Sequence, residues 1–543
     1  MIGIKQTIIK HHEILIALGL FFLFLLVTIP GISWGLPDTW NPDELVHWVE
    51  RALNGKTPID TVNFDYPSLP KWTMYLIGKV LYHFGYAKSE LMLLSRALSV
   101  VLGGLIVVMC YRITRIIGGS IISGLFASAL VTFSSVMAVN ARFAHNDIYL
   151  AFFIIIVVYC LIKYRISGSR LWLYGAFFST GLAASSKYNG GSVMLAVVLV
   201  YLLSEWKTIK HNLLRAGETL FIGAAISFLG FVIGTPKALI SMGFYFKNVI
   251  NALLNHAQYG RQPGAVIGLL GQWEILGSAM SPVIFLVVLA SLIYFIVKAS
   301  MVYSGRVSSD RYRMDLIVTL LVVIAAVNLP ILFSYNYQER FFLPMILLFA
   351  VLFALFLDDI YYLARQHSSR VLQAVVLLVS AAVLVFSVLR TTSIGLLFVN
   401  DNRISASQYL TTLPTGDRIE HTLYPPKIPE KHFSKIFNYP IFFTKFPGQV
   451  PPENKAYEFN QGETGIEDRA PKYFVIDSFT YARFSNDFIC QNNSIECEFF
   501  ERLMAGETNY RLIETFDYEL PSFLPQETPA FLNPVILIFQ RES

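Results

Sequence analysis

Eleven apolar segments, each close to the length that crosses a bilayer as a helix, constrain this chain more than any other feature. About 20 predominantly apolar residues make such a span. The candidate spans are residues 13–32, 92–111, 119–139, 147–162, 171–186, 192–206, 216–235, 278–297, 315–334, 342–362 and 371–391. We therefore expect a polytopic α-helical membrane protein with about 11 transmembrane helices.

The composition supports this fold class. Hydrophobic residues make up 55% of the 543 residues and charged residues only 15%, whereas a soluble domain carries about 25% charged residues. This balance excludes a disordered chain, a coiled coil and an ordinary cytosolic enzyme. The net charge is only +5 and the basic residues form no patch, so we expect no nucleic-acid partner.

The first span follows two basic residues, Lys5 and Lys10, as a signal peptide would. No small-residue cleavage site clearly follows it, however, because Pro30 to Trp34 match such a site poorly. We therefore interpret this span as a retained membrane anchor.

The basic residues predict the topology. With a cytoplasmic N-terminus, the inner connections hold 16 Lys and Arg residues and the short outer connections after the first loop hold six. Cytoplasmic loops carry such an excess in membrane proteins. Because the number of spans is odd, the C-terminal region is expected outside the cytoplasm. The sequence thus predicts an integral protein of the plasma or inner membrane.

This topology divides the chain into two domains. Residues 1–399 are expected to form the transmembrane module, with long outer loops at 33–91 and 236–277, and residues 400–543 an extracytoplasmic soluble domain. The latter region has 13 basic and 20 acidic residues, and runs such as 473–476 and 535–539 are typical of strands. We expect a small α/β domain there. Connections of this length are rarely without function.

Four cysteines leave one question open. Cys110 and Cys160 fall in or near spans and are expected to pack as apolar residues. Cys490 and Cys497 lie close together in the predicted outer domain, where either a disulfide or two free thiols fit. No pattern of His and Cys indicates zinc.

Two adjacent carboxylates, Asp43 and Glu44, begin the first outer loop. One interpretation is a helix start, with Asn41 as the cap and Pro42 in the first turn. The other is a general base beside the membrane surface, which deprotonates an acceptor hydroxyl.

The second outer turn concentrates Arg142, His145 and Asp147 within six residues at the end of a span. Ionisable groups at such a position are by default a hypothesis of function. Ordinary snorkelling of interfacial side chains is the alternative.

Several basic residues are expected on the outer side, against the general charge bias. They are Lys187, His256, Arg261 and Arg340. A cation there suits an anionic phosphate. Each is also explained as an interfacial anchor, and Glu339 is a ready partner for Arg340.

Six short segments, taken in order, carry a resemblance to a known family. They are residues 41–44, 64–69, 142–147, 186–190, 234–236 and 340–344, and residues 401–416 look like the start of the outer domain in bacterial members. The chain resembles the dolichyl-phosphate-mannose–protein mannosyltransferase-like families, which have the C-type glycosyltransferase fold, and the related bacterial aminoarabinose transferases. The resemblance covers most of the chain.

The resemblance implies transfer of a sugar, with inversion, from a polyprenyl-phosphate donor to an extracytoplasmic protein, lipid or glycan. By this resemblance Asp43 is the catalytic base with Glu44 beside it, and Asp147 is the second acid. Arg142, Lys187 and Arg340 hold the donor phosphate, and we add His256 and Arg261 to this set. Tyr66, His145, Tyr188 and Asn189 lie in or beside the same segments, and we expect them to contact substrate. The C-terminal domain departs from the eukaryotic pattern, so the acceptor is not implied.

Two alternatives stay open. The first is a transporter or flippase of lipid-linked glycans, although the chain shows none of the internal repeats that such proteins commonly have. The second concerns a divalent metal, because Asp43, Glu44, His145 and Asp147 are ligand types whose convergence the sequence does not reveal.

Overall fold

The computed structural model describes residues 2–59, 64–261, 266–307 and 310–542. Residues 60–63 and 262–265 of the two predicted outer loops therefore lie outside the described residues. The chain forms two compact units. The first comprises Met1–Ile32, Asp43–Ala257 and Val266–Thr391, and the second comprises Ser33–Pro42, Gln258–Ala265 and Thr392–Ser543.

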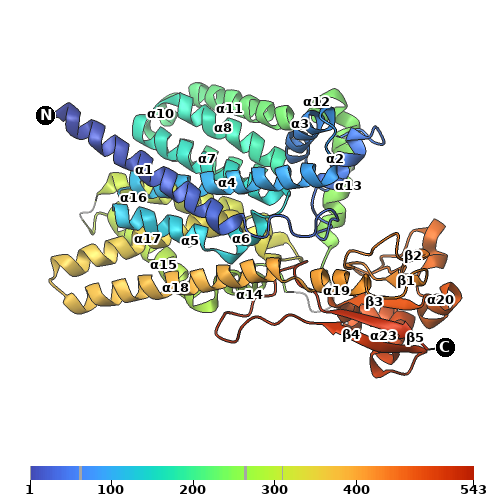
Figure 1. Ribbon diagram of the computed structural model, residues 1–543. Helices are drawn as coiled ribbons and strands as arrows, with labels where there is room; N and C mark the ends of the chain where they lie inside the picture. Colours follow the sequence, from blue (N-terminus) through green and yellow to red (C-terminus); the bar gives the residue numbers. More distant parts are fainter. Residues whose placement is uncertain (1, 60–63, 262–265, 308–309, 543) are drawn as a thin grey trace. The chain divides into compact units, whose positions relative to one another are not determined.

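The first unit is built of helices (Figure 1), and the residues of the last helix, α18, from Thr392 onward belong to the second unit. In chain order they are α1 (Ile2–Thr28), α2 (Val46–Leu53), α3 (Leu69–His83), α4 (Lys88–Ile116), α5 (Ile121–Thr132), α6 (Ser135–Asn140), α7 (Asn146–Ser167), α8 (Arg170–Ser186), η1 (Tyr188–Ser192), α9 (Val193–Ser204), α10 (Trp206–His211), α11 (Leu213–Gly234), α12 (Lys237–Ile240), α13 (Met242–Gln258), α14 (Leu269–Met280), α15 (Pro282–Tyr303), α16 (Arg311–Asn328), η2 (Ile331–Phe333), η3 (Glu339–Phe342), α17 (Leu343–Gln366) and α18 (Arg370–Val399).

Each predicted span overlaps one of these helices, namely α1, α4, α5, α7, α8, α9, α11, α15, α16, α17 and α18. The predicted span 119–139 is divided between α5 and α6. Within the described residues, seven helical segments are long and apolar enough to cross a membrane, and three further apolar helices are shorter. The prediction of a polytopic helical membrane protein is confirmed. The short α5 ends where Ser134 caps α6 by accepting a hydrogen bond from the Met137 amide.

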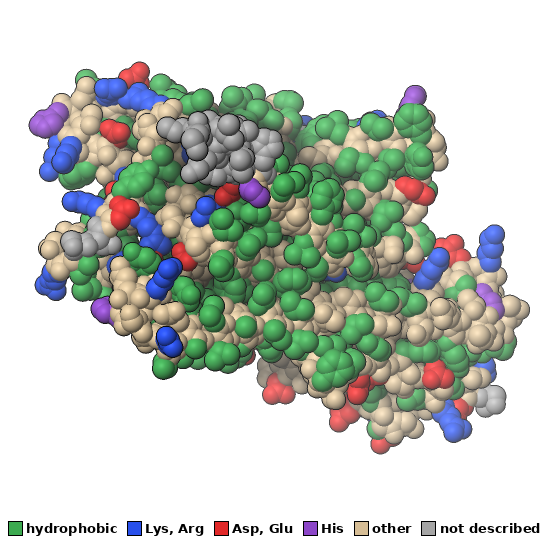
Figure 2. Space-filling model, turned by 60° about the vertical axis from the view of Figure 1, so that its left-hand side comes forward, with side chains coloured by type: hydrophobic (Ala, Val, Ile, Leu, Met, Phe, Trp, Pro, Cys, Tyr) green, Lys and Arg blue, Asp and Glu red, His purple; other side chains and the backbone are tan. Residues whose placement is uncertain are grey.

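The outer surface of these helices is apolar, as expected of a surface that faces lipid. Hydrophobic side chains cover most of the helical face seen in Figure 2. On α11, Phe221 is 77% exposed and Leu214 is 89% exposed. Helix α17, by contrast, is enclosed on nearly all sides and packs against α4, α5, α7, α15 and α16.

Helices α8 and α11 approach each other through glycines. A Cβ atom built at Gly181 would lie 1.9 Å from the Ser227 carbonyl oxygen, and one at Gly230 would lie 2.4 Å from the Phe178 carbonyl oxygen. Small residues allow the backbones of membrane helices to come this close. The contact fixes the end of α8, after which the chain enters the candidate site.

The second unit contains a five-stranded sheet in the order β2-β1-β3-β5-β4. Its elements are α19 (Asn402–Leu410), β1 (Arg418–His421), β2 (Lys435–Asn438), η4 (Glu453–Glu458), α20 (Gly462–Arg469), β3 (Tyr473–Asp477), α21 (Ser478–Tyr481), η5 (Ala482–Ser485), α22 (Asp487–Asn492), α23 (Ser494–Ala505), β4 (Tyr510–Phe516) and β5 (Ile536–Arg541). Strand β1 pairs in parallel with β2 and β3, whereas β5 pairs antiparallel with β3 and β4. The predicted α/β character is confirmed.

The two faces of the sheet have separate cores because side chains alternate along a strand. On β3, Phe474 and Ile476 pack with Phe499 and Phe500 of α23. Tyr473 and Val475 belong to the opposite core, which also includes residues of α19.

A buried charge pair joins the 33–42 segment to the start of α19. The Arg403 guanidinium donates to the Asp401 carboxylate at 2.8 Å, and both side chains are fully buried. The Trp34 Nε1 donates to Asp401 Oδ2 at 3.0 Å, and the Arg403 guanidinium lies 4.5 Å from the Trp40 ring centre. The same segment lines a cavity of about 760 Å³ together with residues 421–431 and Ile436.

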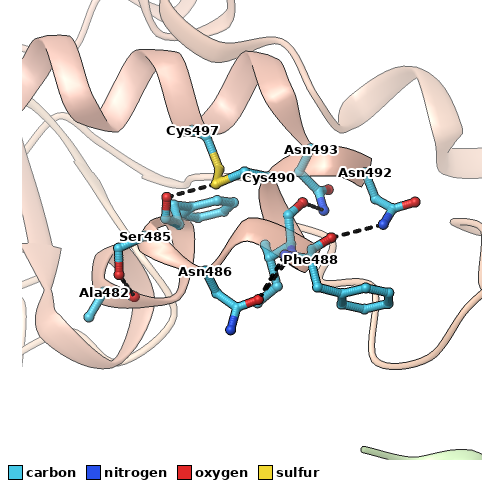
Figure 3. Close-up of a disulfide and its surroundings, with 10 residues drawn as sticks. Ala482, Ser485, Asn486, Phe488, Cys490, Asn492, Asn493 and Cys497 are labelled. Atoms are coloured by element: carbon cyan, nitrogen blue, oxygen red, sulfur yellow. Dashed lines mark hydrogen bonds between the residues drawn. A yellow bond between two sulfur atoms is a disulfide. The ribbon is translucent and has the colours of Figure 1, made fainter. Parts of the chain in front are cut away.

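The second unit contains a disulfide bond at the cysteine pair for which the sequence left two alternatives. Cys490 of α22 and Cys497 of α23 form a disulfide, with Cα atoms 5.6 Å apart (Figure 3). Cys110 and Cys160 are buried and free, as expected of packing residues.

Candidate functional site

Asp43 contacts a cation that lies almost 300 residues later in the sequence. Arg340 Nη2 donates to Asp43 Oδ2 at 2.7 Å. Asp43 precedes α2, which begins only at Val46, so the alternative interpretation of residues 41–44 as a helix start is wrong. The Asp43 side chain keeps 29% of its surface exposed. It is therefore accessible to another molecule.

Glu44 has a different environment. Its carboxylate accepts two hydrogen bonds from Arg96 of α4, at 2.8 and 2.7 Å, and both side chains are fully buried. Glu44 Oε1 also accepts from the Ala144 amide at 2.8 Å. The residue thus ties the first loop to α4 and to the turn before α7.

Asp147 lies in the first turn of α7, where a carboxylate is favoured by the helix dipole. It is buried and bridges two partners. Lys187 Nζ donates to Asp147 Oδ1 at 2.6 Å, and His145 Nδ1 contacts Asp147 Oδ2 at 2.8 Å. Arg340 Nε lies 3.9 Å from Asp147 Oδ2. Asp43, His145, Asp147, Lys187 and Arg340 therefore form one network, in which the acids alternate with Arg340 and Lys187.

Two cations of this network share an aromatic neighbour. The Lys187 ammonium lies 4.3 Å and the Arg340 guanidinium 5.8 Å from the centre of the Phe341 ring. Lys187 follows α8 in extended backbone, and Arg340 lies on η3 just before α17. Both side chains are partly exposed, at 14% and 16%.

A cavity of about 190 Å³ opens beside this network. Its walls come from the first loop, the α8–α9 connection, α13 and the connection between α16 and α17. The lining residues are Asp65, Tyr66, Lys187, Tyr188, Asn189, Leu253, His256, Pro330, Ile331, Ser334, Asn336 and Phe341. Five of the residues selected from the sequence, namely Tyr66, Lys187, Tyr188, Asn189 and His256, thus line one cavity.

Three polar atoms of the site are buried and lack a hydrogen-bond partner among the described residues. They are His145 Nε2, Asn189 Oδ1 and Arg340 Nε. Leaving a buried acceptor unpaired costs about 1–3 kcal/mol. Such atoms are suited to bind hydroxyl groups of a ligand.

The titration behaviour of the site follows from burial and charge. Burial acts to raise the pKa of Asp43, but Arg340, with a smaller contribution from His145, holds this pKa below its usual range. Burial lowers the pKa of His145 even though Asp147 opposes this effect. Burial likewise lowers the pKa of Lys187, and Asp147 partly offsets it. At neutral pH Asp43 is ionised and His145 is neutral, so His145 donates its Nδ1 proton to Asp147 and leaves Nε2 as an acceptor.

Thr235 connects two segments of the site by side-chain hydrogen bonds. Its Oγ1 accepts from the Ser68 amide at 3.2 Å and hydrogen bonds Ser185 Oγ at 2.7 Å. This threonine lies in one of the short segments that carried the resemblance. It connects the first loop to the end of α8, two residues before Lys187.

Arg142 does not share these surroundings. Its guanidinium donates to the carbonyl oxygens of Pro30, Val27 and Ala138 at 2.9, 2.8 and 2.6 Å. The side chain is buried and satisfies carbonyl groups at the C-terminal end of α1, just after it, and in α6. We propose a structural role for Arg142 in place of the expected phosphate contact.

The two remaining basic residues lie in different units. His256, at the end of α13, lines the cavity, and its Nε2 lies 3.3 Å from Asp65 Oδ1. Arg261 belongs to the Gln258–Ala265 segment of the second unit. Its role in phosphate binding stays a prediction.

Three residues of the site, Arg96, Asp65 and Phe341, are not among the predicted site residues. Arg96 lies inside a predicted span, and a charge within a span indicates a buried partner, so a signal for it was present. Asp65 and Phe341 line the cavity, but no sequence pattern distinguished them from their neighbours.

The described residues contain no group of three or more His, Cys, Asp or Glu side chains that could hold a metal ion. Of the three acids and one histidine considered for such a site, Glu44 is engaged by Arg96 and Asp147 by Lys187. This arrangement of the described residues does not fit a divalent cation.

Comparison with known proteins finds similarity to one enzyme family in part of the chain. Residues 80–245, less than half of the chain, match the family model of the dolichyl-phosphate-mannose-protein mannosyltransferases. An uncharacterised protein of Aquifex aeolicus (strain VF5) is 28% identical over 194 residues, which cover 33% of this chain and 37% of that protein. The match thus spans little more than a third of the relative's length.

Two solved structures are similar to most of the chain. The oligosaccharyltransferase of Archaeoglobus fulgidus, tethered with an acceptor peptide, matches with a TM-score of 0.50 at 12% identity, covering 91% of this chain and 72% of that one. ArnT of Cupriavidus metallidurans, bound to undecaprenyl phosphate, gives a TM-score of 0.48 at 12% identity, with 97% of each chain covered. The predicted resemblance to membrane glycosyltransferases and the predicted C-type fold are confirmed.

Proposed function

We propose that this protein is a membrane glycosyltransferase that transfers a sugar from a polyprenyl-phosphate donor to an acceptor on the extracytoplasmic side. The observation that carries the proposal is the cavity beside the five-residue charge network, which offers cations for a phosphate and an ionised carboxylate for an acceptor. The similarity of residues 80–245 to a family named for a lipid-phosphate sugar donor supports the donor class.

The donor phosphate is assigned to the cations at the cavity. Lys187 and His256 line it, and Arg340 lies beside Lys187 at the shared Phe341 ring. A phosphate bound in the cavity would interact with Lys187 and Arg340, whose positive charges Asp147 and Asp43 now neutralise. The same cations stabilise the negative charge that develops on the leaving phosphate.

Asp43 is assigned as the general base. It is ionised at neutral pH and 29% exposed, whereas Asp147 is 1% exposed and held by Lys187 and His145. Only Asp43 of these two carboxylates is accessible to an acceptor hydroxyl. Glu44 and Asp147 act as positioning residues, the first through Arg96 and the second through Lys187 and His145.

The reaction is a single displacement. The acceptor oxygen attacks the anomeric carbon, Asp43 takes the hydroxyl proton, and the bond between that carbon and the phosphate oxygen breaks. The polyprenyl phosphate leaves with the bonding electron pair. Attack opposite the leaving group inverts the anomeric configuration. Tyr66, Tyr188, Asn189 and the Nε2 atom of His145 are assigned to contacts with the sugar.

The test is a transfer assay with purified protein in detergent. We expect release of polyprenyl phosphate from a polyprenyl-phosphate sugar, with an inverted glycosidic bond in the product. Lys187→Gln should raise the donor KM, because a charge-assisted contact contributes about 1.5–3 kcal/mol, equivalent to roughly 10- to 150-fold. Lys247→Gln is the matched control, since this exposed lysine on α13 does not line the cavity.

Movement of intact glycolipid across proteoliposomes without any release of polyprenyl phosphate would contradict the proposal. That result would favour the transporter alternative.

A further inference from the structure

A second cavity of the first unit, of about 900 Å³, is not used by the proposed reaction. It is lined by the ends of α7, α9 and α15, by α10 and by the first half of α16. The lining residues are Arg165, Val200, Leu203, Ser204, Trp206, Lys207, Thr208, Tyr303, Arg311, Asp315, Val318, Thr319 and Val322.

This cavity lies at the opposite ends of helices that reach the candidate site. Helix α7 begins beside Asp147 and ends just after Arg165, and its 22 residues correspond to about 33 Å. Near its N-terminus, helix α16 contributes Arg311 and Asp315 to this cavity. Just after its C-terminus, Pro330 and Ile331 line the cavity of the candidate site. The distance matches the thickness of a bilayer core, so this cavity lies at the other membrane surface.

The charge of the cavity is incompletely balanced. Arg165 Nη2 pairs with Asp315 Oδ2 at 2.7 Å, and the Tyr303 hydroxyl donates to the other Asp315 oxygen at 2.5 Å. Lys207 and Arg311 have no ion-pair partner in the part of the chain that the structure describes. Two uncompensated cations therefore line its wall.

The other lining residues include aromatic and aliphatic side chains, which are the kinds that contact lipid. Trp206 is 56% exposed and Tyr303 42% exposed, as is typical of aromatic residues at the level of lipid headgroups. Val200 and Leu203 of α9, with valines of α16, form an apolar wall next to the cations. Leu203 is 60% exposed.

We propose that this cavity binds an anionic phospholipid, with the phosphate at Lys207 and Arg311 and an acyl chain along the apolar wall. Basic pockets between membrane helices at the cytoplasmic surface bind anionic headgroups in this way. The planar guanidinium of Arg311 can hold two phosphate oxygens at once. The inference does not depend on the proposed transfer reaction, because its readout is lipid binding.

The test measures the thermal unfolding of detergent-purified protein with added phosphatidylglycerol or phosphatidylcholine. We expect phosphatidylglycerol to raise the unfolding temperature more than phosphatidylcholine does. The double variant Lys207→Gln/Arg311→Gln should lose most of this difference. The matched control Lys163→Gln/Arg170→Gln removes one cation near the end of α7 and one at the start of α8, neither of which lines the cavity. This control variant should keep the difference between the two lipids.

Native mass spectrometry on the same proteins provides a second readout that does not depend on stability. Fewer bound phosphatidylglycerol molecules in the cavity variant than in the control variant would support the site. An equal unfolding shift and equal lipid retention in both double variants would overturn it. A shift reproduced by inorganic phosphate alone would also overturn it, because the site would then take a soluble anion.

Discussion

Two adjacent carboxylates, Asp43 and Glu44, have opposite surroundings in this protein. Asp43 is partly exposed and paired with Arg340, and Glu44 is fully buried and paired with Arg96. The resemblance implies that Asp43 is the base with Glu44 beside it, but the sequence does not reveal how Glu44 is engaged. The burial of Glu44 and its pairing with Arg96 support the proposal that Asp43 is the base and Glu44 a positioning residue.

We predict that Glu44→Gln acts mainly on stability. Removing one partner of a buried ion pair leaves the other charge uncompensated, which costs about 3–5 kcal/mol. Denaturant unfolding should show this loss, whereas turnover per folded molecule should fall less than in an Asp43 variant. The double variant Glu44→Leu/Arg96→Met should regain much of the stability, because two apolar side chains replace the pair. A double variant no more stable than Glu44→Gln would contradict the assignment.

The pH dependence of turnover is a second prediction at this scale. Asp43 acts as a base only when ionised, so activity should be lost as the pH falls through its pKa, which Arg340 holds below the usual range. Arg340→Gln removes the largest lowering contribution, so the opposing effect of burial on the pKa of Asp43 is less compensated. The acidic limb of the profile of kcat/KM against pH should therefore move to higher pH in that variant.

Lys247→Gln is the control for the pH measurement, since it removes a cation outside the site. An acidic limb that stays in place in Arg340→Gln would show that the titrating group is not Asp43.

At the scale of elements, the spans were predictable and the site contacts were not. Twenty-residue apolar runs are a local signal, and each of the eleven predicted segments overlaps a helix. The contact between Asp43 and Arg340 joins residues 297 positions apart, which no local pattern encodes. Arg142 resembled a phosphate ligand in sequence, but its guanidinium binds backbone carbonyls of the α1 region.

The close contact of α8 and α11 yields a prediction for these elements. Gly181→Ala places a methyl group where the Ser227 carbonyl oxygen lies 1.9 Å away, so the helices must separate. Overpacking of this kind costs about 1–3 kcal/mol. The unfolding temperature should fall, and transfer activity should fall with it, because α8 carries Lys187 at its end.

Gly217→Ala on α11 is the control, since a Cβ atom there meets open space. This variant should be at least as stable as the wild type. Equal stability of the two variants would contradict the close packing of α8 on α11.

At the scale of the whole molecule, the central prediction is topology. From the basic residues and the odd number of spans we predict that both the candidate site and residues 400–543 lie outside the cytoplasm. A reporter fused after residue 450, or a cysteine introduced there and labelled with an impermeant reagent, should report the outer side. A cytoplasmic signal would reverse the orientation and remove the site from the side where we expect the acceptor.

The most direct measurement of the central claim compares wild type and Asp43→Asn in single turnover with a polyprenyl-phosphate sugar and acceptor. Asn keeps the shape of the side chain but cannot take the proton. We predict that turnover falls roughly 10²- to 10⁴-fold, while binding of the lipid donor persists. Near-normal turnover in Asp43→Asn, together with its loss in Asp147→Asn, would contradict the account and assign the base to Asp147.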